Sequence, residues 1–325
     1  MPASGVSSSG MNVLEAAERL RLEMAKAIAG QEAVIEQATA ALLANGHVLL
    51  EGVPGLAKTL LVRALARCVS LDYGRVQFTP DLMPSDVIGT SVFDPRTAEF
   101  KLRKGPVFVG MLLADEINRT PPKTQAALLE AMEERRVTID GAPHLLPPPF
   151  IVFATQNPID FEGTYPLPEA QLDRFLLKVV LDYPDIEAER SILRRHHEGF
   201  SPTSLEAAGL QPVIDQTTLA ELQAEVQAEK VEDKVFDYIM AIVRATRDSD
   251  DMAFGASPRA GIALLNCSKA IAAIRGRDFV IPDDVKELAL PVLRHRVSLR
   301  PEAEIEGLSV DRVLTSIVDA QVVPR

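Results

Sequence analysis

The chain has 325 residues, of which 47% are hydrophobic and 25% charged, so it can bury a sizeable core without disulfides. Its formal net charge of -12 argues against a dedicated nucleic-acid-binding protein, because such proteins usually carry a basic surface. The sequence contains no run of about 18 apolar residues, the length that a membrane-spanning helix would need. Two distant cysteines, Cys68 and Cys267, fit a reducing compartment, so we expect a cytoplasmic protein.

The N-terminal segment Met1–Gly10 is small and polar, and we expect a disordered tail there rather than a signal peptide. Residues 12–44 show the apolar spacing of helices, with a break at Gly30-Gln31. Apolar runs of strand length then recur at residues 47–50, 75–79, 109–114, 150–154 and 175–181. Helix-like stretches separate several of them, at 59–69 and at 123–134, where Thr120 is the expected N-cap. This alternation predicts an α/β domain, a parallel sheet with helices on both faces.

Strand signals stop after Tyr183-Pro184, and the rest of the chain predicts helices. The expected helices are Thr218–Val226, Val231–Arg247, Pro258–Arg275 and Asp283–Arg294. The third has Ser257 as N-cap and Gly276 after its end. The predicted organisation is therefore an α/β domain over residues 11–183 and an all-helical domain over residues 184–325.

A loop between the first strand and the next helix reads Gly52-Val53-Pro54-Gly55-Leu56-Ala57-Lys58-Thr59. In this position it predicts a phosphate-binding loop, whose N–H groups and helix N-terminus bind anions. Lys58 would reach the β- and γ-phosphates, Thr59 would place its hydroxyl on Mg²⁺, and Leu60 follows in the same turn. Ala57 replaces the usual second glycine. We expect that to cost little if the backbone there is helical, while Gly55 keeps the permissive position.

Two further strands end in polar residues, where open parallel sheets place their chemistry. Asp115 and Glu116 follow the strand at 109–114. Asp115 would hold Mg²⁺, through water, and Glu116 would orient and polarise an attacking water. Asn157 follows the next strand and could hydrogen-bond the γ-phosphate or that water. Taken alone, the two acids could cap a helix and the asparagine could form a turn before a proline.

Together these motifs resemble the MoxR family of AAA+ ATPases, from about Ile28 to Leu299. The matching segments are Gly52–Thr59 (Walker A), Leu112–Glu116 (Walker B), Ala154–Pro158 (sensor 1), Gly163–Phe175 and Ser257–Ala260 (sensor 2). The stretch from Gln156 to Phe175 is the most specific, because Walker motifs alone define only the superfamily.

The resemblance implies a P-loop AAA+ core followed by an α-helical lid, ATP and Mg²⁺ as cofactors, and hexameric rings with ATP at subunit boundaries. Arg174 looks like the arginine finger, and Arg259 like sensor 2, acting in its own subunit or the neighbour's. The segment 81–104 and a hairpin at 136–149, signalled by the turn Asp140-Gly141, resemble the family's helix-2 insert and pre-sensor-1 hairpin, which face the ring's centre. Family members are chaperone-like partners of von Willebrand factor A domain proteins.

The sequence therefore predicts Mg²⁺-dependent ATP hydrolysis that remodels protein partners, in complex assembly, metal-cofactor insertion or activation. From the residues alone, Arg174 and Arg259 could instead form surface salt bridges. A nucleic-acid translocase is the first alternative, since Arg135 and Arg136 on the hairpin could touch phosphates. A nucleotide-gated scaffold without turnover is the second, and the substitution at Ala57 favours it slightly.

Overall fold

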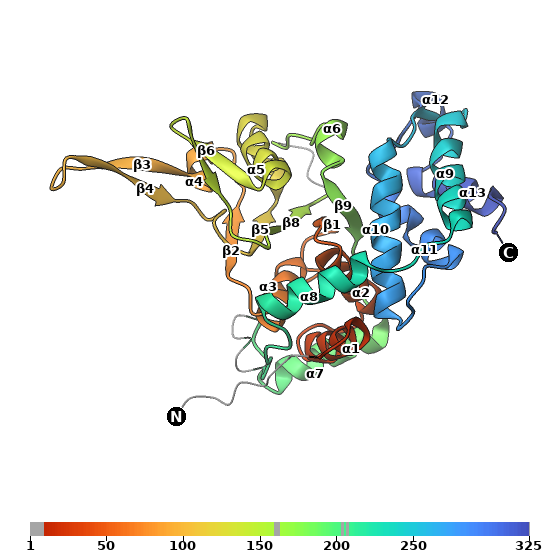
Figure 1. The fold of residues 1–325 in the computed structure, drawn as a ribbon, viewed down its shortest axis with the longest axis horizontal. Helices are drawn as coiled ribbons and strands as arrows, with labels where there is room; N and C mark the ends of the chain where they lie inside the picture. The colour runs from red at the N-terminus through yellow and green to blue at the C-terminus, as the bar shows by residue number, and fades with distance from the viewer. Residues whose placement is uncertain (1–9, 159–162, 203–204, 206–207, 325) are drawn as a thin grey trace.

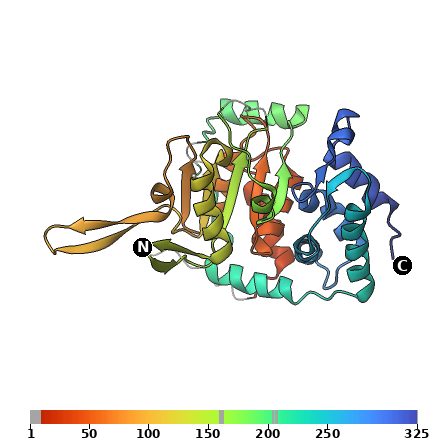
Figure 2. The same ribbon diagram turned by 90° about the horizontal axis from the view of Figure 1, so that it is seen from above.

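The structure is a computed structural model that describes residues 10–158, 163–202, 205 and 208–324. The predicted tail Met1–Gly10 thus lies outside the described residues except for Gly10. An α/β core and a helical lid lie side by side (Figure 1), and a two-stranded hairpin projects from the side of the core away from the lid. Figure 2 shows the same arrangement from above, with the hairpin and the lid at opposite ends of the molecule.

The core contains the predicted parallel sheet. Its five strands have the order β2-β5-β8-β1-β9. They are β1 (His47–Glu51), β2 (Tyr73–Gln77), β5 (Met111–Asp115), β8 (Ile151–Gln156) and β9 (Phe175–Val180). Every pairing between neighbours is parallel, so the carboxyl ends of all five strands lie at one edge. The loops that follow β1, β5 and β8 are therefore brought together there.

Helices cover both faces of the sheet, as predicted. One face packs against α2 (Glu32–Leu43) and α3 (Lys58–Cys68), and α1 (Val13–Met24) packs on these two helices. The other packs against α5 (Pro122–Glu134). Because strand side chains alternate, Val48 and Leu50 join the first core, whereas Leu49 between them joins the second. This double burial explains why the strands read as continuous apolar runs.

The start of α5 differs from the prediction. Thr120 was the expected N-cap, but the N-cap position is taken by Pro121 and the helix begins at Pro122. A residue that precedes a proline is driven out of the helical region, and Pro121 accordingly has an extended backbone (φ -58°, ψ 153°). Thr120 is instead fully buried in front of the helix.

The two segments that were predicted to be insertions each form an antiparallel hairpin. The first contains α4 (Pro84–Ile88) and the antiparallel pair β3 (Gly89–Asp94) and β4 (Glu99–Lys104), which form the projecting hairpin in Figure 1. The second is the hairpin of β6 (Arg136–Ile139) and β7 (Ala142–Leu145). Asp140 and Gly141 have φ values of 49° and 81°, as the predicted two-residue turn requires.

The lid is helical, with a small addition. Its helices are α9 (Asp233–Asp248), α10 (Pro258–Ile274), α11 (Pro282–Leu293), α12 (Pro301–Ile305) and α13 (Val310–Ala320). Two short strands, β10 (Met252–Phe254) and β11 (Ser298–Leu299), pair antiparallel. The sequence did not indicate these strands, which are too short to show a two-residue period, nor did it single out α13.

Two helices after residue 183 lie against the core. They are α7 (Ile186–His197), which was not among the expected helices, and α8 (Gln216–Gln227). Arg195 of α7 donates to the carbonyl of Ala25 at 2.9 Å, and Gln223 of α8 donates to the carbonyl of Leu42 at 2.8 Å. A boundary at 183/184 remains a prediction, and these contacts join both helices to α1 and α2.

The lid is fixed to the sheet by a buried arginine that follows α11. The side chain of Arg296 is only 3% exposed and donates to a carboxylate oxygen of Asp173 at 2.7 Å. It also donates to the carbonyls of Phe175 and Leu176 at 2.6 and 3.1 Å. The neighbouring ring of His295 contacts the carbonyl of Phe175 at 2.9 Å. The start of β9 and the end of α11 therefore form one polar joint.

Replacing Arg296 by alanine should lower the free energy of unfolding by about 3–5 kcal/mol, because it leaves the half-buried carboxylate of Asp173 and two backbone carbonyls without their buried cationic partner. Lys286→Ala is the matched control, since its pair with Asp319 is solvent-exposed and should contribute little to stability. Urea denaturation measures both. Equal losses for the two variants would show that the joint does not hold the lid.

Candidate nucleotide-binding site

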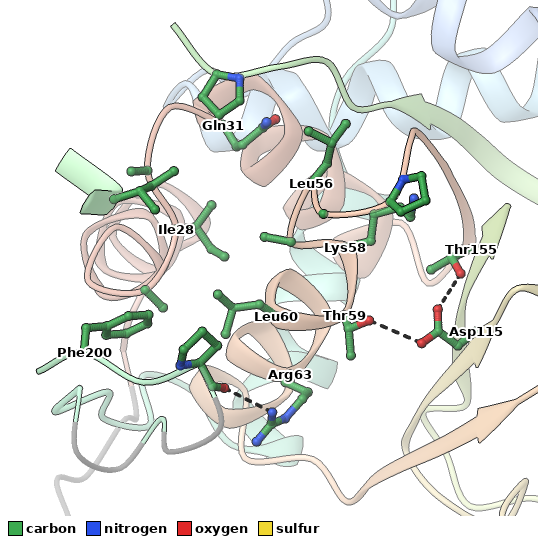
Figure 3. A pocket seen from close by; sticks show the side chains of 18 of the residues that line it. Ile28, Gln31, Leu56, Lys58, Thr59, Leu60, Arg63, Asp115, Thr155 and Phe200 are labelled. Carbon is green, nitrogen blue, oxygen red and sulfur yellow. Dashed lines mark hydrogen bonds between the residues drawn. The ribbon is translucent and has the colours of Figure 1, made fainter. Parts of the chain in front are cut away.

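A cavity of 720 Å³ opens at the carboxyl edge of the sheet, where the loops after β1, β5 and β8 meet. Figure 3 shows its two ends. Lys58, Thr59, Asp115 and Thr155 lie at the polar end, whereas Ile28, Leu60 and Phe200 lie at the other. A nucleotide has the same division, with charged phosphates at one end and an apolar base at the other.

The loop between β1 and α3 forms the wall of this cavity. Residues Pro54 to Leu60, in this loop and the first turn of α3, line the cavity, but Gly52 and Val53 do not. Their carbonyl oxygens instead accept hydrogen bonds from the ammonium group of Lys58, that of Val53 at 3.0 Å. A side chain at Gly52 would meet the carbonyl oxygen of Leu181 at 3.0 Å, so the loop packs tightly on the chain after β9.

The backbone at Ala57 is not helical, so the condition under which the alanine would cost little is not met. Ala57 has φ 58° and ψ 22°, in the left-handed region, where a Cβ atom is unfavourable. Gly55 has φ 90° and is the permissive position that we expected. The substitution at Ala57 therefore carries a steric cost, because a left-handed residue joins the loop to the first turn of α3.

Burial lowers the pKa of Lys58, and the nearby carboxylates of Asp115, Glu116 and Glu51 oppose this shift. The ammonium group donates hydrogen bonds to carbonyls of its own loop. The group is thus a cation held in a partly buried pocket, and a phosphate there would offer it a stronger, charge-assisted hydrogen bond.

Asp115 is held by residues from three elements. One carboxylate oxygen accepts from the hydroxyl of Thr155 on β8 at 2.6 Å. The other accepts from the hydroxyl of Thr59 on α3 at 3.3 Å and from Arg75 on β2 at 2.7 Å. The hydroxyl and the carboxylate that were expected to hold Mg²⁺ are therefore adjacent.

These donors fit a magnesium ion that is shared with a nucleotide. Hydroxyl, carboxylate and phosphate oxygens are the ligands that Mg²⁺ prefers. Within the described parts of the chain, no group of three His, Cys, Asp or Glu residues could hold a metal. An ion between Thr59 and Asp115 would therefore need further oxygens from phosphates and water.

Glu116 lies beside Asp115 in a strained conformation, with φ 57° and ψ 51°. It precedes the short 3-10 helix η1 (Ile117–Arg119). Its carboxylate accepts from the amide of Gln77 at 2.6 Å and pairs with Arg119 at 3.4 Å. Its backbone N–H donates to the hydroxyl of Thr155 at 2.8 Å. Such strain costs about 1–3 kcal/mol and is typical of functional positions.

Asn157 lies directly after β8, is buried, and lines the cavity. The structure thus brings Asn157 together with Lys58, Thr59, Asp115 and Glu116, although they come from three separate segments of the sequence. Leu60, another predicted residue, lies at the apolar end.

The sequence reasoning missed two residues on β2. The Nη2 atom of Arg75 donates both to Asp115 and to the side-chain oxygen of Gln77, the latter at 2.8 Å. The side-chain amide of Gln77 in turn donates to Glu116. A signal was available, because Arg75 and Gln77 alternate around the buried Val76 and so share one face of the strand. It was also missed that α7 contributes Ile192, Leu193 and His196 to the cavity.

Arg174 and Arg259 do not reach this cavity. They line a second one, of 350 Å³, and both pair with Glu133 at the end of α5, at 2.6 and 3.1 Å respectively. Arg174 immediately precedes β9, at the amino edge of the sheet. The six residues of β9 separate the two edges by about 20 Å at 3.3 Å per residue. In the single chain these arginines form salt bridges, which were the alternative, on the residues alone, to roles as arginine finger and sensor 2.

The two hairpin arginines are also engaged. Arg135 donates to the carbonyl of Asn45 at 3.1 Å, and Arg136 pairs with Glu134 at 3.1 Å. Burial lowers the pKa of Arg135. Both side chains, which in the translocase alternative could touch nucleic-acid phosphates, thus have partners within the chain.

Comparison with known proteins agrees with this architecture. Residues 47–177 match the family model "ATPase family associated with various cellular activities (AAA)", and residues 244–317 match an AAA lid domain. A crystal structure of a candidate ATPase from Cytophaga hutchinsonii superposes with a TM-score of 0.87 at 40% identity, over 96% of this chain and 97% of that one. A P-loop on a parallel sheet that is followed by such a lid defines an ATPase of the AAA+ class.

Relatives narrow the class further. The chain is 43% identical to Chaperone MoxR1 of Mycobacterium tuberculosis, over 95% of this chain and 82% of the relative. It is 32% identical to Protein MoxR of Methylorubrum extorquens, over 91% of each, and 48% identical to the uncharacterized protein YeaC of Bacillus subtilis, over 92% of each. The chain therefore belongs to the MoxR family of AAA+ ATPases.

None of the helices in its described part has the length and apolar character needed to traverse a bilayer.

Replacing Ala57 by glycine should raise the free energy of unfolding by about 0.5–1 kcal/mol, because glycine tolerates the left-handed backbone. Ala66→Gly is the matched control: it lies inside α3 and should lower stability by about 1 kcal/mol or more. Both changes are measured by urea denaturation without nucleotide. A loss of stability in Ala57→Gly would contradict the left-handed conformation.

Proposed function

We propose that this chain binds ATP with Mg²⁺, hydrolyses it at sites between subunits of a ring, and uses the cycle to remodel a protein partner. One observation carries the proposal: the P-loop cavity and the pair Arg174–Arg259 lie at opposite edges of the sheet. Each subunit thus has the two parts of an active site at separate places. A neighbour in a ring can join them, whereas a single chain cannot.

In the proposed reaction, Lys58 exchanges the carbonyls of its loop for the β- and γ-phosphates of ATP. Thr59 and Asp115 would hold Mg²⁺, which neutralises charge on those phosphates. Glu116 orients and polarises the attacking water, and Asn157 fixes that water or the γ-phosphate. The bond from Gln77 to Glu116 holds the carboxylate in the resting site. The base lies at the apolar end, against Ile28, Leu60 and Phe200.

Arg174 is proposed as the arginine finger and Arg259 as sensor 2, both acting on the neighbour's γ-phosphate. Their common contact with Glu133 supports this assignment, because it places both guanidinium groups on one surface. A cation there would stabilise negative charge on the transferring phosphoryl group. The sequence left open whether Arg259 acts in its own subunit or in the neighbour's, and we propose that it acts in the neighbour's.

The ring is expected to be a hexamer in the cytoplasm, and its partner a protein with a von Willebrand factor A domain. Complex assembly, metal-cofactor insertion and activation are the remodelling outcomes that we propose. The printed name of one relative, Chaperone MoxR1, supports the chaperone-like role. The projecting hairpin β3–β4 carries the exposed rings of Phe93 and Phe100, 5.4 Å apart, which suits contact with a protein chain.

Glu116→Gln should bind ATP with normal affinity but hydrolyse it at least about 100-fold more slowly, because the general base is lost while the phosphate contacts remain. Lys58→Ala is the contrasting variant. It should weaken ATP binding by about 1.5–3 kcal/mol, the usual contribution of a charged hydrogen bond. Equilibrium binding and phosphate release measure the two effects. Near-normal turnover in Glu116→Gln would remove Glu116 from the mechanism.

Arg174→Ala should retain ATP binding and lose hydrolysis by about 10³-fold or more, as arginine fingers do. Specific activity of the unmodified protein should rise with subunit concentration. Mixing Arg174→Ala with Lys58→Ala subunits should restore activity, because intact sites form where the two meet, and Arg259→Ala should behave alike. Arg19→Ala, on an exposed pair of α1, is the control. Concentration-independent activity that survives Arg174→Ala would overturn the proposal.

A further inference from the structure

The carboxylate of Glu133 binds both arginines that are proposed to act on a neighbour's nucleotide. One oxygen contacts Arg174 at 2.6 Å, and the other contacts Arg259 at 3.1 Å. The two arginines are 85 residues apart in sequence, one before β9 and the other in the first turn of α10. Glu133 thus joins the core to the lid through a single anion with two acceptors, which is also how a phosphate group would engage two guanidinium groups.

The surroundings of this anion carry excess positive charge, although the chain as a whole is acidic. Among the described residues that line the 350 Å³ cavity, the cations are Arg135, Arg174, Arg259 and Arg296, and the acids are Glu133 and Asp173. Asp173 is engaged by Arg296 at 2.7 Å. Glu133 is therefore the acid that faces Arg174 and Arg259, and those two arginines lower its pKa, so it is ionised near neutral pH.

The contact between Glu133 and the two arginines is exposed to solvent and leaves one hydrogen-bond donor unpaired, as expected of a contact that another anion can replace. The side chain of Arg259 is 61% exposed, and that of Glu133 is 36% exposed. Solvent-exposed pairs of this kind are weak. On the other side, the Nε atom of Arg174 is buried without a hydrogen-bond partner in the described structure, which is an unfavourable state for a donor.

We propose that Glu133 is a positioning residue that takes the place of the γ-phosphate in the unassembled subunit. It holds Arg174 and Arg259 together, and the neighbour's nucleotide must displace it when the ring closes. This inference rests on the proposed function. A γ-phosphate carries more charge than a carboxylate and offers bidentate, charge-assisted hydrogen bonds, so it wins the exchange. The competition nevertheless raises the subunit concentration at which the ring becomes active.

The test is ATPase activity per subunit against subunit concentration for the full chain, Glu133→Gln and Glu134→Gln. Glutamine keeps the shape of the side chain but removes the competing charge. Glu134 is the matched control, because it is the adjacent carboxylate and pairs with Arg136 instead. Salt is adjusted so that the midpoint of the unmodified protein lies within the measured range. Thermal unfolding verifies that both variants are folded.

In Glu133→Gln we expect the half-maximal concentration to fall about two- to fivefold, fivefold being about 1 kcal/mol, with the maximal rate within about twofold. Glu134→Gln should leave both unchanged. A midpoint for Glu133→Gln that is unchanged or higher would overturn the inference, since Glu133 would then not compete or would assist assembly. If Arg174→Ala still abolishes a concentration-dependent activity in the same assay, the proposed function stands while only the role of Glu133 fails.

Discussion

The parallel alignment of five strands is the constraint on which the rest of this molecule depends. It places every strand's carboxyl end at one edge, so that the loops after β1, β5 and β8 converge on a single cavity. The same alignment places the start of β9 at the other edge, together with Arg174. The helix α5 runs back across the sheet and delivers Glu133 to that edge. One topological fact therefore both assembles the P-loop site and separates it from the arginines.

The polar edge is built from unfavourable local conformations that the tertiary structure supports. Ala57 and Glu116 both have left-handed backbones, one at the start of α3 and the other just after β5. In an isolated peptide, each residue would adopt this conformation only at a cost in conformational energy. A hydrogen bond from Gln77 and one from the Glu116 backbone N–H to Thr155 hold Glu116, and the close approach of Gly52 to Leu181 holds the loop. Buried strands on both sides make this edge rigid enough to keep charged groups in register.

For the proposed reaction, the position of the lid matters as much as the geometry of the nucleotide-binding site. Arg296 is buried at the joint with β9, next to the residue pair Asp173-Arg174. Ser257, just before α10, also donates to Asp173, at 3.3 Å. Arg174 and Arg259 therefore belong to one connected polar network that includes both domains. A displacement of the lid relative to β9 would carry Arg259 with α10 while Arg174 stays at the start of β9, so the position of the lid sets the distance between the two arginines.

The sequence by itself determined the fold class, the P-loop, the acidic pair and Asn157, because each has a local signature: an apolar run that ends in a specific polar group. It also placed Ser257 and Pro258 at the start of α10 and the turn Asp140-Gly141 within the hairpin. Only the tertiary structure decided the rest. Whether Ala57 is helical or left-handed, whether Arg75 and Gln77 contact the acids, and where Arg174 and Arg259 lie all depend on contacts between segments far apart in sequence. Spacing along the chain encodes hydrophobic period and loop chemistry, but it carries no information on which side chains meet across a sheet.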